Sequence, residues 1–282
     1  MAIVITEIAE LLLKGIISGI GGFIGGKMLS SIFKSTVPSY FTEVYKVIAD
    51  IMKEELSTNT IAQIDGEING LVQWIENQYN ARKSSGAAKT ELYNMLLPQV
   101  NDVAVHMVAV LQEKEFSSSA LSVFIIGASI HLALLQELAT VDPDVSHADK
   151  SSYVATIQKY ADEYREYVER VYCNIATARI NFISPVSRKC FAAGGVGGLA
   201  ASHSYLEWKD SLTGEEFSGS GHTSYTGEEP SEEEFKDAEK TRAEYIEKVI
   251  SNLRKETNDP VTAAATWRKL VEQPLPSILT AK

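Results

Sequence analysis

The side chains that could perform catalysis or bind a metal are scattered along this chain of 282 residues. Asp102 and His106 lie four residues apart, a spacing that predicts a surface pair on one helix face. Cys173 and Cys190 are the only cysteines; they form no CxxC metal signature, and we expect both to be reduced and structural. The sequence contains no HExxH, GxSxG or Walker pattern. It therefore predicts no enzyme activity, no metal site and no cofactor.

Two further patterns have a chemical and a structural interpretation. His131 lies in an apolar stretch, where we expect a histidine with its hydrogen bonds satisfied in the core. The alternative is a pH-sensitive latch, because charging a buried imidazole would loosen the packing around it. Gly195 to Ala200 match GxGxxA, but no strand and helix flank them as nucleotide binding requires, so we expect a flexible loop.

The charge of the chain limits its partners. The sequence has 26 Lys and Arg against 37 Asp and Glu, a net charge of −11. Nucleic acids are bound through clustered Lys and Arg, so we expect no nucleic-acid partner. Adsorption to an anionic membrane surface by charge alone is disfavoured for the same reason.

The most informative segment is Phe116–Gln136, which contains no Asp, Glu, Lys or Arg. As a helix it would be ~31 Å long, close to the thickness of the hydrocarbon core of a bilayer. A helix that is apolar on all sides in a water-soluble protein is usually buried at the centre of a bundle. Two interpretations remain open: a plain core helix, or a core helix able to leave the core for lipid.

Helical periodicity dominates the chain up to about residue 184. The predicted helices cover about 3–33, 39–56, 60–83, 88–115, 120–139, 147–183 and 232–256, with a shorter one after Pro260. We expect Pro98 to kink the fourth of them. Residues 185–230 are rich in Gly, Ser and Thr, and we expect an ordered loop there with a short hairpin around Leu212–Gly214.

The predicted fold is all-α, a bundle of about seven long helices around the central hydrophobic helix. We expect one domain over 1–282, with a Gly-rich N-terminal helix at 1–35, a core bundle at 36–184, the 185–230 insertion and C-terminal helices at 231–273. The N-terminal helix contains GxxxG spacings such as Gly15–Gly19, which either allow close contact in lipid or leave the segment loosely ordered and open to cleavage.

Glu7 and Glu10 stand where a signal peptide would have basic residues, and Lys14 interrupts the apolar run. We therefore expect no classical export signal, synthesis as a soluble protein in the cytoplasm, and later release to act on target membranes.

Three segments carry a resemblance to a known family. They are LSVFIIGASIHLALLQELA (Leu121–Ala139), IAQIDGEINGLVQWIENQYNA (Ile61–Ala81) and YADEYREYVERVYCNI (Tyr160–Ile175). In this order they resemble the fifth, third and sixth helices of the N-terminal domain of the insecticidal crystal (Cry) delta-endotoxins. The resemblance implies a pore-forming bundle of seven helices, in which a hairpin of the fourth and fifth helices, here about 88–139, enters a target membrane. Two departures are that no long β-rich receptor-binding region follows and that 185–230 interrupts the last helices.

On this interpretation the membrane-inserting residues are those of the central helix: Val123, Phe124, Ile125, Ile126, Ile130, His131, Leu132, Leu134 and Leu135. Asn94, Asn101 and Asp102 lie on the polar face of the fourth helix and are candidates to line a pore, because a charge in a membrane must face water. The implied partners are a target-cell membrane, further copies of the chain and a separate receptor-binding protein. The alternative is a soluble helical interaction or regulatory module that kept the bundle and lost pore formation.

Overall fold

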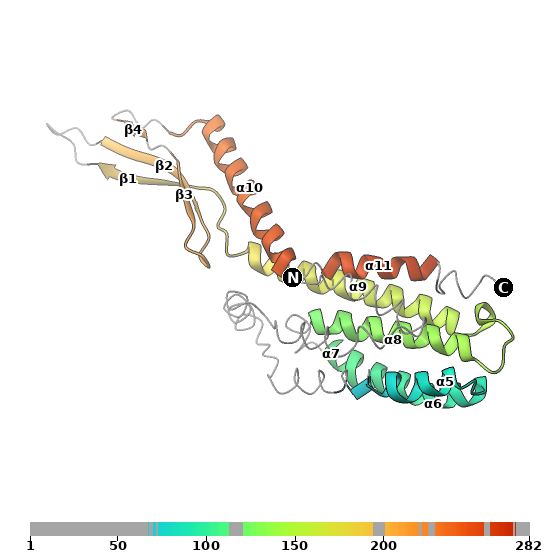
Figure 1. Cartoon of the computed structure of the whole chain (residues 1–282). Helices are drawn as coiled ribbons and strands as arrows, with labels where there is room; N and C mark the ends of the chain where they lie inside the picture. The colour runs from blue at the N-terminus through green and yellow to red at the C-terminus, as the bar shows by residue number, and fades with distance from the viewer. Residues whose placement is uncertain are drawn as a thin grey trace. The chain divides into compact units, whose positions relative to one another are not determined.

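The computed structural model describes residues 67, 70–71, 73–112, 121–193, 201–219, 222–224, 229–256, 260–272 and 274. These residues are mostly helical, with a small four-stranded sheet (Figure 1). The predicted helical class is confirmed in this coarse form, and the sheet is an addition to it. The first two predicted helices, the GxxxG spacings and the Gly195–Ala200 loop lie outside the described residues.

Contacts between Cα atoms divide the chain into two compact units. One is made of Met1–Cys173 and Glu256–Lys282, and the other is Asn174–Lys255. We call them the helical unit and the sheet unit. This division does not test the predicted organisation into one domain, which stays a prediction.

The helical unit contains the elements predicted as helices three to six and the last short helix. Their bounds are η2 Ile75–Tyr79, α5 Asn80–Ser84, α6 Lys89–Asp102, η3 Val103–Ala109, α7 Val110–Gln112, α8 Leu121–Val141, η4 Ala148–Lys150, α9 Tyr153–Ile180 (which continues into the sheet unit) and α11 Pro260–Glu272. The segments η2 and η3 have π geometry and η4 has 3-10 geometry.

Local sequence explains where these helices end. Gly86 has a φ of 78° and follows α5, and its N–H donates to Lys83 O at 3.1 Å. Glycine takes this left-handed conformation at little cost, so it ends the helix and opens the turn to α6. Pro98 lies inside α6 and does not end it. The change to π geometry comes at Val103, five residues later.

A turn at Asp142–Asp144 connects α8 to η4. The Asp144 N–H donates to Asp142 Oδ1 at 3.0 Å, and the Ser151 hydroxyl donates to Asp142 Oδ2 at 2.6 Å. Asp142 is buried, and its two oxygens are satisfied by the backbone and hydroxyl that it holds in place.

The sheet unit consists of the end of α9, four strands and α10. The strands are β1 Ser187–Ala193, β2 Ala201–Lys209, β3 Glu216–Ser218 and β4 His222–Ser224; α10 is Glu232–Glu256. Strand β2 pairs antiparallel with β1 on one edge and with β3 and β4 on the other. The predicted hairpin turn follows β2, where Gly214 has a φ of 77° and donates to Asp210 O at 2.9 Å.

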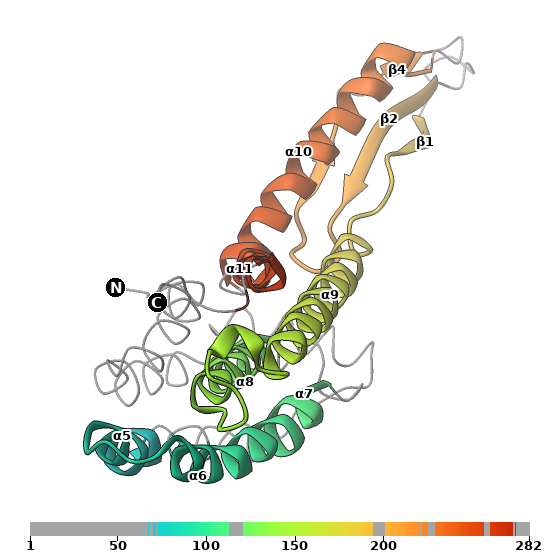
Figure 2. The same ribbon diagram turned by 90° about the vertical axis from the view of Figure 1, so that its right-hand side faces the viewer.

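The sheet forms because β2 alternates in polarity. Leu206 and Trp208 are buried, and the residues between them point to the other face. Helix α10 runs along the Leu206 face (Figure 2), and Trp208 contacts Tyr245 of α10 with ring centroids 4.9 Å apart. The alternation in residues 203–208 therefore signals a paired strand. The expectation of an all-α fold with an ordered loop here is wrong.

A buried ion pair joins three elements of the sheet unit. Arg179 at the end of α9 donates to both carboxylate oxygens of Asp210, at 3.2 and 2.5 Å. The Tyr245 hydroxyl donates to the same carboxylate at 2.8 Å. Burial alone would raise the pKa of Asp210, but the bonds from Arg179, Leu212 N–H and Tyr245 outweigh it and lower that pKa.

Candidate functional site

Among the described elements of the helical unit, α8 is the most deeply buried. Of its side chains that the structure describes, all are buried except Thr140, which is half-buried. The predicted inserting residues Phe124, Ile125, Ile130, His131, Leu132, Leu134 and Leu135 are at most 3% exposed. Val123 and Ile126 belong to the same helix, and their side chains lie outside the description. The structure thus brings this predicted set together in the core; its role in a membrane stays a prediction.

Aromatic side chains of α9 cover one side of α8. Phe124 of α8 lies against Tyr164 and Tyr167, with ring centroids 5.6 and 4.4 Å away. The Tyr167 hydroxyl donates to Leu111 O at 3.0 Å. That bond satisfies a carbonyl in the last turn of α7 and ties α9 to the segment that precedes α8.

His131 has a hydrogen-bond partner in the core, as the sequence predicts. Its Nδ1 lies 2.6 Å from the Tyr164 hydroxyl, and its ring contacts Tyr160 edge to face at 5.0 Å. Burial lowers the pKa of His131 to about 4, because a charged imidazole would lose its hydration there. Burial also raises the pKa of Tyr164. The pair is neutral near neutral pH.

Glu137 is the residue that sequence reasoning missed. It is the one charged residue in the sequence Leu121–Val141, and it is fully buried. The Tyr79 hydroxyl and the Lys83 ammonium each donate to Glu137 Oε1 at 2.6 Å. Its Oε2 has no hydrogen-bond partner among the described residues. Burial and then Glu137 raise the pKa of Tyr79.

The end of α8 thus contains an ion pair, with Glu137 buried and Lys83 partly exposed, that ties it to α5, and a hydrogen bond from Tyr79 that ties it to η2. The only sequence signal for this site is that a single Glu follows directly after the charge-free segment Phe116–Gln136. Its partners are more than fifty residues away along the chain, so no local pattern could reveal them.

Two other polar residues of α8 bind the C-terminal segment. The Trp267 indole N–H donates to Ser129 Oγ at 3.3 Å, and the Gln136 amide donates to Pro274 O at 2.7 Å. Trp267 itself is fully buried in α11. Helix α11 is therefore part of the sheath around α8.

The segment α6–η3–α7 is the partner of α8 in the predicted hairpin. Apolar residues at helical spacing form a stripe along it, which is buried at Leu92, Leu96, Val100, Val103, Met107 and Leu111 and half-buried at Val110. Gly127 lies close to Met107, since a Cβ built there would lie 3.1 Å from Met107 Sδ. The two halves of the hairpin pack directly against each other.

The predicted pore-lining residues Asn94, Asn101 and Asp102 are all exposed on the opposite face of this segment. Asp102 Oδ1 lies 3.5 Å from His106 Nε2, the predicted surface pair. The structure thus places the three polar residues on one face and the buried stripe on the other; lining of a pore stays a prediction.

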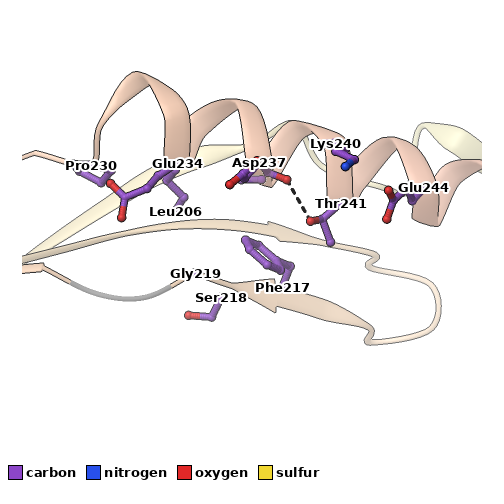
Figure 3. A pocket seen from close by; sticks show the side chains of 11 residues that line it. Leu206, Phe217, Ser218, Gly219, Pro230, Glu234, Asp237, Lys240, Thr241 and Glu244 are labelled. Atoms are coloured by element: carbon purple, nitrogen blue, oxygen red, sulfur yellow. Dashed lines mark hydrogen bonds between the residues drawn. The ribbon is translucent and has the colours of Figure 1, made fainter.

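None of the helices within the described ranges meets the usual test of length and hydropathy for crossing a membrane. The same residues contain no cluster of three or more His, Cys, Asp or Glu that could hold a metal ion. In the sheet unit, a groove of about 500 Å³ lies between α10 and the sheet (Figure 3), lined among others by Leu206, Phe217, Asp237, Thr241 and Glu244. Thr241 uses its hydroxyl within α10, donating to Asp237 O at 2.9 Å.

The comparison with protein families decides the relationship. The family of the delta endotoxin N-terminal domain matches residues 12–185, more than half of the chain. This chain belongs to that family. The predicted resemblance is confirmed, and the endotoxin family is one of pore-forming toxin-type domains and not a family of known enzymes. No protein of curated function gives a significant match. The match covers the whole predicted hairpin and ends at residue 185, just before β1.

Proposed function

We propose that this endotoxin-family chain forms pores, by inserting the hairpin of α6–η3–α7 and α8 into a target membrane. The single observation that carries the proposal is α8: a buried helix in the matched region whose only charge is Glu137. An apolar helix loses little when lipid replaces the protein core around it, because both remove apolar surface from water. The backbone of a helix is also satisfied internally, as lipid requires.

The polar contacts of α8 are then the bonds that must break. Insertion of the hairpin separates His131 from Tyr164, Glu137 from Lys83 and Tyr79, and Ser129 from Trp267. Contacts inside the hairpin, such as Gly127 against Met107, are kept. In this proposal the surrounding elements α9, α11 and η2–α5 do not enter the membrane.

The finer features follow as parts of the same proposal. Several copies would turn their apolar faces to lipid and Asn94, Asn101 and Asp102 to a water-filled lumen. We propose that the residues before the described ranges complete a bundle of about seven long helices. We also propose that the protein is made soluble, is released, and is directed to an insect-type target membrane by a separate receptor-binding protein.

Dye release from vesicles tests the proposal. Purified protein is added to phosphatidylcholine vesicles filled with a quenched dye, from pH 4 to pH 10, with and without brief proteolysis. The expected result is release that rises with protein concentration more steeply than linearly, because several copies make one pore. No release at any pH, in either form, would contradict pore formation and favour the soluble interaction module.

Two cross-linked variants test which part moves. In a background with Cys173 and Cys190 replaced by Ser, the pair Tyr93→Cys and Tyr153→Cys is joined by a reducible bifunctional thiol reagent. The native hydroxyls of these tyrosines are 2.6 Å apart, so the link holds the hairpin to α9. We expect release to be lost and to return on reduction.

The matched control links the two halves of the hairpin to each other, through Met107→Cys and Gly127→Cys. Their close approach suits a disulfide. Because the hairpin is proposed to insert as one body, this link should leave release unchanged. Equal loss in both variants would mean that α8 leaves α6–η3–α7 as well, and would overturn the hairpin mechanism.

A further inference from the structure

The sheet unit has a second feature that the pore proposal does not use. Phe191 of β1 and His203 and Tyr205 of β2 form an aromatic cluster, which we call the outer patch. The ring centroid of Phe191 lies 5.0 Å from that of His203 and 6.0 Å from that of Tyr205. Phe191 is 53% exposed, the highest value among the aromatic residues with large exposed surface, and His203 and Tyr205 are half-exposed.

The register of the strands explains why the patch faces outward. Phe191 pairs with His203, and Tyr205 follows two residues later on the same face. The intervening Ser204 and Leu206 are buried on the other face, the one that α10 covers. The sheet therefore has one face packed on α10 and one aromatic face that α10 does not cover.

Charge is distributed unevenly along the β1–β2 pair. Residues 191–206 contain no Asp, Glu, Lys or Arg, although the chain as a whole carries 63 such residues. Charged side chains border the patch on its own face: Lys189 is the cross-strand partner of Tyr205 and pairs with Glu207 at 3.1 Å. Further along, Lys209 pairs with Glu216 at 3.6 Å. The pair of strands thus has an uncharged aromatic end and a charged base.

We propose that the outer patch binds the interfacial region of a zwitterionic lipid bilayer. Aromatic rings with a polar edge prefer the depth of the lipid headgroups, where one part of the ring is apolar and the other is wet. The charge argues for this occupant, because a chain of net charge −11 is repelled by anionic lipid. The outer patch is the uncharged surface through which such a chain can approach a neutral bilayer.

This contact is independent of the hairpin. It requires no helix to leave the helical unit, and it gives the chain a membrane-binding surface outside the region that the endotoxin family matches. It predicts binding to vesicles without any release of their contents, so the two proposals fail separately.

The first test places an environment-sensitive fluorophore on the patch. In the background without native cysteines, Phe191→Cys is labelled with a nitrobenzoxadiazole dye and mixed with phosphatidylcholine vesicles. The expected result is an increase and a blue shift of the emission at position 191. The matched control is Phe235→Cys on α10, which is also an exposed phenylalanine of the sheet unit and should show no change.

The second test measures affinity. The double variant Phe191→Thr and Tyr205→Thr keeps residues that favour strands, and it should co-sediment with the vesicles with roughly tenfold lower affinity, since apolar contact with the interface is lost. Phe235→Thr serves as the control and should bind as the wild type does. Far-UV circular dichroism verifies that the variants are folded.

Three results would overturn the proposal. They are unchanged emission at position 191, equal loss of affinity in the Phe235 control, and a patch variant that loses self-association by analytical ultracentrifugation while it still binds vesicles. The last result would make the patch a contact between copies of the chain.

Discussion

At the scale of residues, the polar groups of α8 decide how firmly the helix is held. His131 is neutral in the core, whereas Glu137 is fully buried with its Oε1 2.6 Å from the Lys83 ammonium. The first needs no counterion, and the second depends on one. These two residues should therefore respond to different changes, pH for His131 and loss of the partner for Glu137.

His131 should make the folded protein less stable as the pH is lowered. The pKa is about 4 in the folded state and about 6.5 when unfolded, so below pH 6.5 the unfolded state takes up a proton that the folded state resists. The contribution of His131 to the free energy of unfolding should be fully present above pH 6.5. It should be ~3 kcal/mol smaller at pH 4. Urea unfolding of the wild type and of His131→Gln, compared at pH 7 and pH 4, measures this.

The wild type should lose more stability than the variant over that range, since carboxylates such as Asp210 titrate in both proteins and cancel. Equal losses would show that His131 is protonated in the folded state at pH 4 without cost.

Removal of Lys83 should leave the Glu137 carboxylate buried without its counterion. We expect Lys83→Met to lower the free energy of unfolding by about 3 kcal/mol, as for other broken buried pairs. The double variant Lys83→Met and Glu137→Gln should recover most of that loss, because the charge is gone. Urea unfolding at pH 7 gives both values; a double variant no more stable than the single one would contradict a charge-based explanation.

At the scale of elements, caps and turns set the boundaries that the sequence predicts. Helix α10 begins with a capping box, in which Glu234 N–H donates to Ser231 Oγ at 3.3 Å and Ser231 N–H donates to Glu234 Oε2 at 2.7 Å. This local signal explains why the predicted start of α10 agrees with the structure. Helix α9, by contrast, begins six residues later than predicted, because residues 148–150 form a 3-10 turn.

Ser231→Ala removes the side chain that caps α10. We expect it to lower the free energy of unfolding by about 1 kcal/mol. Ser211→Ala, at an exposed hydroxyl in the turn after β2, is the control and should cost less. Thermal unfolding followed by circular dichroism checks the order of the two variants; the reverse order would contradict the cap.

At the scale of the whole molecule, net charge decides which membranes the chain can approach. The charge of −11 is opposed to the negative surface potential of anionic bilayers. The same charge favours no particular lipid when it is screened, because the Debye length falls to about 3 Å at 1 M salt.

Dye release should therefore be faster from neutral vesicles than from vesicles containing anionic phosphatidylserine, at low ionic strength and neutral pH. Raising the salt concentration should narrow the difference. Parallel stopped-flow measurements on the two kinds of vesicle provide the test, and a preference for anionic lipid at low salt would count against a charge-limited approach.

The sequence by itself determined the local features of this protein. The helices from residue 75 to 112 and the starts of α10 and α11 follow from periodicity, caps and prolines, which act within a few turns. The burial of α8 follows from the absence of charge over Phe116–Gln136, since such a segment has no face that water would solvate.

Only the tertiary structure decided the features that join distant parts of the chain. Neither the Glu137–Lys83 pair nor the Arg179–Asp210 pair has a sequence signature, because each partner is an ordinary charged residue until folding removes water from both. The same holds for the sheet: β2 is recognisable as a strand only once β1, β3 and β4 supply its hydrogen bonds and α10 covers one of its faces. Helical periodicity depends on residues that are close in the sequence, whereas ion pairing and burial depend on which distant residues the fold brings together.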